Sequence, residues 1–308
     1  YMFIMMNAAR YAVGVQGIAI AERAYQKAVA YARDRVQSRP VDGSMNTAAP
    51  IIHHPDVKRM LMTMRASTEG CRAMAAVAAA AYDASHHHPD AEARKENATF
   101  YEFLVPLVKG YSTEMSLEVT SLGVQVHGGM GFIEETGAAQ YYRDAKILTI
   151  YEGTTAIQAN DLVGRKTARD GGTTAKAIAQ RIEETEQQLA AGSAQAKAVG
   201  KRLTAARQAF VDVVDFIAAN TKGNPNAAFA GSVPYLMLAG NLMAGWQMAR
   251  ALLVAEDLSK KGQDTAFMQA KITTARFYAD HILSRAPGVR DAIVEGAEAV
   301  TALSADAF

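Results

Sequence analysis

Helical periodicity of the apolar residues restricts this chain more than any other feature. Apolar side chains recur three or four residues apart, as at Val57, Met60 and Leu61, and no segment alternates convincingly with a period of two. Each such pattern is typical of a helix that buries one face against its neighbours. The chain has 308 residues, of which 50% are hydrophobic, and this is ample for two domains of ordinary size. We therefore predict an all-α fold.

Turn-forming residues divide the pattern into two sets of helices. The first set is predicted at about 4–35, 55–86, 91–126, 138–145 and 154–169, with a loop at 37–54. Pro106 should kink the third of these helices, because proline lacks the N–H that a helix interior needs. The second set is predicted around 178–189, 199–217, 233–260 and 265–284, with a short helix after 287. Two glycines within 170–174 separate the sets, so we predict one helical bundle at 1–170 and another at 173–308.

Composition excludes several classes of protein. The formal net charge is +1, which gives no general field for nucleic acid or an anionic membrane. Cys71 is the only cysteine, so neither an intrachain disulfide nor a four-thiolate metal site can form. The histidines at 86–88 are expected to end a helix, and no metal site is predicted. The apolar run at 233–255 contains Arg250 and two amides, which indicates a buried helix. No secretory signal is visible at 1–6, so a cytoplasmic protein is expected.

Two motifs could carry chemistry. The first is the glycine-rich turn Gln125-Val-His-Gly-Gly-Met-Gly-Phe132, and the second is Tyr151-Glu-Gly-Thr-Thr155, which follows a basic–acidic segment. Taken alone, the glycines end a helix, and the second motif begins one with a threonine cap and an acid near the helix dipole. In this order and spacing, however, they closely resemble the carboxyl-terminal signature of acyl-CoA dehydrogenases. These flavoenzymes remove a proton and a hydride from adjacent carbons of an acyl thioester.

The resemblance implies that Glu152 is the catalytic base that takes the α-proton of the substrate. Such a proton is a very weak acid, so the carboxylate is expected to be buried, with a raised pKa. Hydrogen bonds to the thioester oxygen would stabilise the developing enolate. The residues expected on the substrate side are Asn7, Arg10, Tyr151 and Gly153.

The same resemblance implies an FAD site. Gln125, Gly128 and Gly129 would approach the adenine end of an FAD that is bound mainly to a partner subunit. Arg35, in a segment similar to the family's Tyr-Ala-x-x-Arg-x-x-Phe-Gly, would contact the pyrophosphate, with Gln37 as a further hydrogen-bonding residue. Ser38 and Arg39 replace the usual Phe-Gly there. Thr154 and Ala156 correspond to positions that touch the flavin.

Further elements, at 1–7, 50–61 and 233–236, resemble one branch of the family. It contains the larger bacterial acyl-CoA dehydrogenases, including the 3-(methylthio)propionyl-CoA dehydrogenase type, which carry an extra carboxyl-terminal helical domain. Because the family places a helical domain and a β domain ahead of this region, we expect the chain to be the carboxyl-terminal half of an enzyme, inactive alone. The resemblance also implies a homodimer or homotetramer and an electron-transferring flavoprotein as electron acceptor.

Other functions of the same fold remain open from the sequence. An acyl-CoA oxidase shares the fold but lets oxygen reoxidise the flavin. Some relatives bind DNA, although the nearly balanced charge argues against this. A helical interaction module without catalysis is the plainest alternative, but it leaves unexplained why Arg35, Gln125 and Glu152 fit one template.

Overall fold

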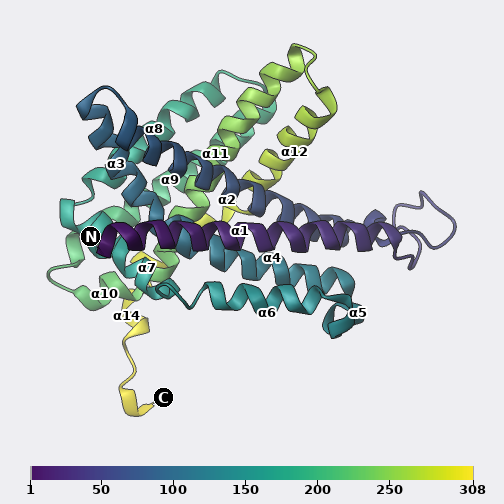
Figure 1. Ribbon diagram of the computed structural model, residues 1–308, viewed down its shortest axis with the longest axis horizontal. Helices are drawn as coiled ribbons and strands as arrows, with labels where there is room; N and C mark the ends of the chain where they lie inside the picture. Colours follow the sequence, from purple (N-terminus) through teal and green to yellow (C-terminus); the bar gives the residue numbers. More distant parts are fainter. Residues whose placement is uncertain (1, 308) are drawn as a thin grey trace.

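The computed structural model describes the backbone of residues 2–307 and the side chains of residues 5–307. Tyr1 and Phe308, the outer ends of the two predicted bundles, lie outside the described residues. Within 2–307 the chain is helical and forms no strand, only an isolated bridge between Val36 and Pro50 (Figure 1). The predicted all-α fold is therefore confirmed.

The first half of the chain consists of long helices followed by shorter ones. In chain order they are α1 (Met2–Asp34), α2 (Pro55–His87), α3 (Ala91–Pro106), α4 (Ser112–His127), the short α5 (Gly129–Phe132), α6 (Ala138–Leu148) and α7 (Thr155–Asp161). Short turns η1 (Ile51–His53), η2 (Leu107–Tyr111), η3 (Glu134–Thr136), η4 (Leu162–Thr167) and η5 (Ala168–Asp170) lie between or after them.

The second half repeats the all-helical pattern. Its elements are α8 (Thr173–Ala190), α9 (Ala194–Asn220), α10 (Pro225–Ala230), α11 (Ser232–Lys260), α12 (Thr265–His281), η6 (Leu283–Arg285), α13 (Ala286–Val294), α14 (Ala297–Val300) and η7 (Ala305–Ala307). No helix of the described chain, α11 included, has the length and apolarity needed to cross a bilayer.

The predicted kink at Pro106 takes the form of a π-helical turn. Pro106 ends α3, and the next five residues form η2, in which the N–H of Ser112 donates to the carbonyl of Leu107. The N–H of Leu107 donates to the carbonyl of Leu104, so the regular i to i−4 hydrogen-bond pattern is interrupted directly after the proline. Gly14 lets α1 lie directly on η2, since a Cβ there would be 2.2 Å from the carbonyl oxygen of Val108. The turn η2 therefore packs between α1 and the rest of the core.

The two halves share one core. A single hydrophobic cluster runs from Ile18 to Ile293, and α11 packs on α2 and η2 of the first half as well as on α9 and α12. At its centre the ring of Phe210 meets Phe103 edge-on and stacks on Tyr235. The division at 170–173 remains a prediction.

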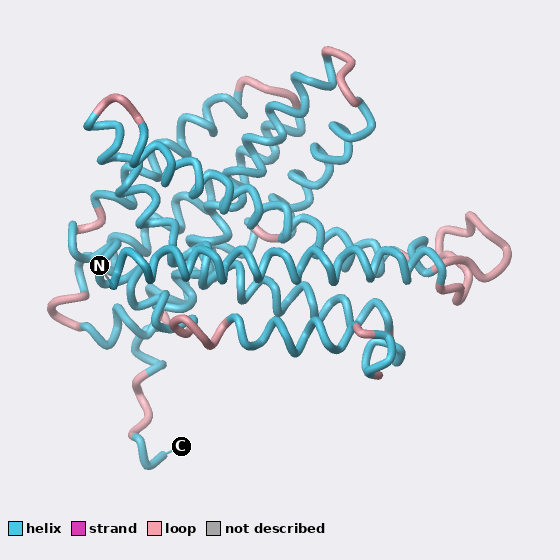
Figure 2. Tube along the Cα trace, in the orientation of Figure 1, coloured by secondary structure: helices cyan, strands magenta, loops and turns pink. Residues whose placement is uncertain are grey.

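Helix α6 lies between the glycine-rich turn and the segment that contains Glu152. Figure 1 shows α1 running along the molecule with α4 and α6 beside it, α5 at the end where α1 stops, and α7 towards the other end. Loops are confined to the helix ends, and the longest projects beyond the end of α1 (Figure 2). The glycine turn and the Glu152 segment therefore lie at opposite ends of α6.

Candidate functional site

The glycine turn after α4 has a conformation that side chains oppose. Gly128 has φ 60° and ψ −139°, a region that residues with a Cβ rarely adopt. A Cβ added at Gly128 or Gly129 would meet nothing within 4 Å, so both backbones face open space. Gly131 differs, because its Cβ would lie 2.3 Å from the carbonyl oxygen of Val124. One glycine thus permits the turn angle and another permits its close packing.

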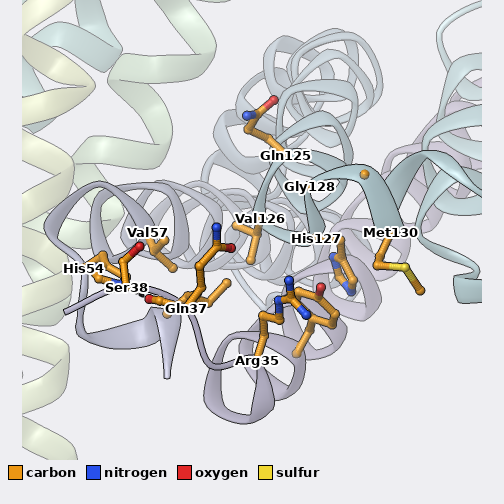
Figure 3. A pocket seen from close by; sticks show the side chains of 13 residues that line it. Arg35, Gln37, Ser38, His54, Val57, Gln125, Val126, His127, Gly128 and Met130 are labelled. Carbon is orange, nitrogen blue, oxygen red and sulfur yellow. Dashed lines mark hydrogen bonds between the residues drawn. The ribbon is translucent and has the colours of Figure 1, made fainter. Parts of the chain in front are cut away.

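A cavity of 590 Å³ opens beside this turn (Figure 3). It lies between the end of α1 with the following loop on one side and the end of α4 with α5 on the other. Its lining residues are Tyr31, Arg35, Gln37, Ser38, Ile51, His54, Val57, Gln125, Val126, His127, Gly128, Gly129 and Met130. Five residues that the sequence assigns to a cofactor thus come together here: Arg35, Gln37, Gln125, Gly128 and Gly129.

Backbone hydrogen bonds hold the loop wall of the cavity. The N–H of Gln37 donates to the carbonyl of Ala49 at 3.0 Å, and that of Ile51 donates to Arg35 at 2.8 Å. The ring of His54 donates from Nε2 to the carbonyl of Gln37 at 2.8 Å. No described residue forms an ion pair with the Arg35 guanidinium, which is exposed at the cavity. The loop therefore presents a cation that is available to a ligand.

His127, to which the sequence assigns no role, forms part of the opposite wall. It is 4% exposed, and its Nδ1 donates to the carbonyl of Gly123 at 2.7 Å, which leaves Nε2 as the acceptor of the neutral ring. Burial lowers the pKa of His127, outweighing the hydrogen bond to Gly123. The uncharged ring is the favoured form.

The Glu152 segment turns sharply between α6 and α7. Glu152 has φ 54° and Gly153 has φ 90°, so two successive residues are left-handed. A Cβ at Gly153 would lie 2.7 Å from Nε2 of Gln158. Thr154 caps α7 by accepting a hydrogen bond from the N–H of Ile157 at 3.4 Å, as the sequence predicts.

The expected burial of Glu152 is wrong for this chain. Its side chain is exposed, because the helices of the chain lie beneath the segment and no described element covers it. Thr154 and Ala156 are exposed as well, whereas Tyr151 is half-buried and donates a hydrogen bond from its hydroxyl to Gln16. The segment thus forms an open surface.

Arg10 and Asn7 lie on the first turns of α1. Arg10 is 8% exposed and pairs with Asp161 of α7 at 3.2 Å. Its buried Nε has no hydrogen-bond partner in the described structure. Asn7 is half-buried. Arg10 therefore joins α1 to the helix that follows Glu152.

One buried residue near this segment was missed from the sequence. Lys109, in η2, is 0% exposed and donates from Nζ to the carbonyls of Leu148 and Gly153. The only available signal was a lysine inside the apolar run 103–111. Sequence alone could not show which groups it meets.

The predicted site residues therefore form two separate groups. The cavity group lies at the start of α6, and the group around Glu152 lies at its end. Since α6 has 11 residues and rises about 1.5 Å per residue, a ligand that touches both groups must be elongated.

Comparison with known protein families shows the family to which the chain belongs. A family model described as acyl-CoA dehydrogenase, C-terminal domain, matches residues 2–166, and one described as acetyl-CoA dehydrogenase C-terminal like matches residues 175–304. The first match covers more than half of the chain. The chain belongs to the acyl-CoA dehydrogenase family, which confirms the resemblance seen in the sequence.

Two curated relatives are similar over nearly the whole chain. The chain is 60% identical over 283 residues to 3-methylmercaptopropionyl-CoA dehydrogenase of Ruegeria pomeroyi, covering 92% of this chain and 48% of that protein. It is 35% identical over 313 residues to the broad-specificity linear acyl-CoA dehydrogenase FadE5 of Mycobacterium tuberculosis, covering 95% and 50%. The chain thus spans about half the length of the curated relatives it matches.

Solved structures share the fold. An acyl-CoA dehydrogenase from Bacillus anthracis, complexed with FAD, superposes with a TM-score of 0.73 at 21% identity, covering 99% of this chain and 50% of that one. ACDH-11 of Caenorhabditis elegans, in complex with C11-CoA, gives 0.69 at 18% identity, covering 94% and 47%.

Proposed function

We propose that this chain is the carboxyl-terminal helical part of an FAD-dependent acyl-CoA dehydrogenase that converts acyl-CoA to trans-2-enoyl-CoA. The observation that carries the proposal is the meeting of Arg35, Gln37 and the open glycine turn in one cavity, with Glu152 at the far end of α6. The 60% identity to a dehydrogenase that acts on a thioether acyl-CoA favours a substrate of that class.

The residues of the cavity fit FAD. The Arg35 guanidinium lacks an ion-pair partner in the described chain, and its planar fork suits a pyrophosphate. Gln125, Gly128 and Gly129 would approach the adenine end of an FAD that is bound mainly to a partner subunit, since a Cβ at either glycine would meet no atom of this chain within 4 Å. Thr154 and Ala156, exposed at the other end of α6, would lie by the flavin. FAD, when bound, supplies the acceptor for the hydride that leaves the β-carbon.

Glu152 takes the α-proton of the acyl group onto its carboxylate in this proposal. The left-handed turn at Glu152 and Gly153 supports an outward position of that carboxylate. The backbone N–H of Glu152 would donate to the thioester oxygen. Because the side chain is exposed here, the dry surroundings that a base needs must come from substrate and from segments outside this chain. Tyr151 and Gly153 would line the substrate directly.

Asn7 and Arg10 are proposed to act on the substrate side from α1. The buried ion pair between Arg10 and Asp161 of α7 supports a position of Arg10 beneath the Glu152 segment, which directly precedes α7. Electrons would leave to an electron-transferring flavoprotein. A homodimer or homotetramer is supported by the apolar side chains that α5 and α6 expose, among them Phe132 at 83% and Ile147 at 52%.

The test is turnover by the enzyme that contains this chain, across a panel of linear and thioether acyl-CoAs. We expect Glu152→Gln to lower kcat by several orders of magnitude while acyl-CoA binding persists, because the amide cannot accept the proton. A modest effect of Glu152→Gln would refute the assignment of the base. Stoichiometric peroxide without added acceptor would indicate an oxidase instead.

A further inference from the structure

Lys109 is a cationic side chain placed entirely inside the protein. It is 0% exposed, and its Nζ donates to the carbonyl oxygens of Leu148 at 2.8 Å and Gly153 at 2.6 Å. No described carboxylate lies within ion-pair distance of it. A buried ammonium is unfavourable unless its donors are used. Its two partners are the last residue of α6 and the residue directly after Glu152.

The backbone that Lys109 holds is the strained part of the candidate site. A left-handed conformation is unfavourable for a residue with a Cβ, and it persists only when surrounding contacts enforce it. The carbonyl of Gly153 accepts from Lys109 and also from Nε2 of Gln158 at 3.3 Å, and the same amide reaches the carbonyl of Glu152 at 3.4 Å. Of these donors, Lys109 alone also ties the segment to the end of α6.

The second half of the chain fixes the turn that carries Lys109. A Cβ at Gly110 would lie 2.7 Å from the side chain of Leu236, so α11 lies directly on the turn. Tyr111 donates from its hydroxyl to the side-chain oxygen of Asn241 at 2.7 Å and lies 3.1 Å from the hydroxyl of Tyr278. Helices α11 and α12 therefore brace the π-helical turn from behind.

The pKa of Lys109 is consistent with its buried position and its two carbonyl partners. Burial lowers the pKa of Lys109 to about 8, partly offset by Glu114 and Glu152 and reinforced by Arg10. An amine keeps two hydrogens after it loses its charge, which is enough for both carbonyls. Lys109 can hold the segment in either form.

We propose that Lys109 is a positioning residue: it clamps the carbonyls of Leu148 and Gly153 and so fixes the left-handed turn that presents Glu152. This rests on the proposed function, in which Glu152 is the base. Lys109 does not touch the substrate. The carboxyl-terminal helices contribute by holding the π-helical turn in place.

The experiment uses the enzyme that contains this chain, with Lys109→Met, Glu152→Gln and Lys166→Met compared. Lys166 is a lysine that pairs with the exposed Glu102 and serves as the matched control. We expect Lys109→Met to lower kcat by roughly 10–100-fold with KM little changed, because the base is misplaced while the binding surfaces remain. Lys166→Met should leave both constants near wild type.

Hydrogen exchange gives a readout that does not depend on turnover. Lys109→Met should speed amide exchange in the peptide 149–158, while 125–132 at the other end of α6 stays unchanged. If Lys109→Met does not fold, Lys109→Gln, which is too short to reach both carbonyls, carries the same measurements.

The outcomes separate the two proposals. If Glu152→Gln abolishes turnover but Lys109→Met keeps normal kcat and exchange, the positioning role is overturned and the function stands. If Glu152→Gln is nearly wild type, the proposed function falls. Faster exchange at 149–158 in Lys109→Met would then show only that Lys109 holds the backbone of this segment, and its role in positioning a base would fall with the function.

Discussion

The ring of His127 stacks on the ring of Tyr31, with centroids 4.4 Å apart and planes 28° from parallel. This contact joins the end of α4 to the last turns of α1. It thereby sets the two walls of the cavity relative to each other. Both residues lie within the cavity lining.

We expect stability to depend on pH through His127. Burial lowers its pKa in the folded chain below the ordinary 6.5, so the unfolded chain takes up a proton first on acidification. The free energy of unfolding should therefore fall as pH decreases from 6.5 towards the folded-state pKa. Urea unfolding of wild type and His127→Gln across pH 5–8 measures this. A difference between them that does not shrink below pH 6.5 would contradict the prediction.

Arg35 is expected to contribute to FAD affinity. Replacing it with alanine should weaken binding roughly 10–100-fold, since hydrogen bonds to a charged group contribute about 1.5–3 kcal/mol. Arg35→Lys should recover only part, because lysine cannot form the planar fork. Fluorescence titration of the apoenzyme with FAD measures both. Arg33→Ala, an exposed arginine outside the cavity lining, should bind like wild type.

The three glycines of the turn should differ in their tolerance of alanine. Gly128→Ala should cost about 1–3 kcal/mol because its φ and ψ lie in a region that residues with a Cβ rarely adopt. Gly131→Ala should cost at least as much, since the new Cβ would overlap the backbone of Val124. Gly129→Ala meets no atom within 4 Å and should be nearly neutral in stability. Thermal unfolding of the three variants checks the order, and a large loss for Gly129→Ala would contradict it.

The ion pair of Arg10 with Asp161 should be costly to break on one side. Asp161 is 8% exposed and also accepts from Arg165, and removing one partner of a buried pair costs about 3–5 kcal/mol. We expect Asp161→Asn to lose close to that amount, and Arg10→Met with Asp161→Leu to recover part of it. Asp56→Asn, which breaks the exposed pair with Arg59, should lose less than about 1 kcal/mol. Equal losses for Asp161→Asn and Asp56→Asn in urea unfolding would contradict the burial argument.

Local patterns made much of the fold predictable. Apolar periodicity placed the long helices, and Pro106 marked the place where the regular helix gives way to a π-helical turn. The threonine cap of α7 and the glycine turn after α4 followed from residue type, because caps and positive φ values depend on neighbouring residues alone. The family resemblance placed Arg35 and Gly128 in one site although they are far apart in the sequence.

Tertiary contacts were not predictable in this way. The exposure of Glu152 depends on which segments cover it, and periodicity carries no information about that. Lys109 was missed because its partners are backbone carbonyls whose positions only the folded chain defines. The shared core of the two halves likewise depends on packing across long sequence separations.

Helix α6 has a consequence for how this chain can vary. It is an uninterrupted helix of 11 residues between the glycine turn and the Glu152 segment. Its length therefore sets the distance between these two parts of the candidate site. One inserted residue would lengthen it by about 1.5 Å and rotate its far end by roughly 100°. Related chains should therefore tolerate insertions in the projecting loop after α1 but keep the count of residues between Gly128 and Glu152 constant.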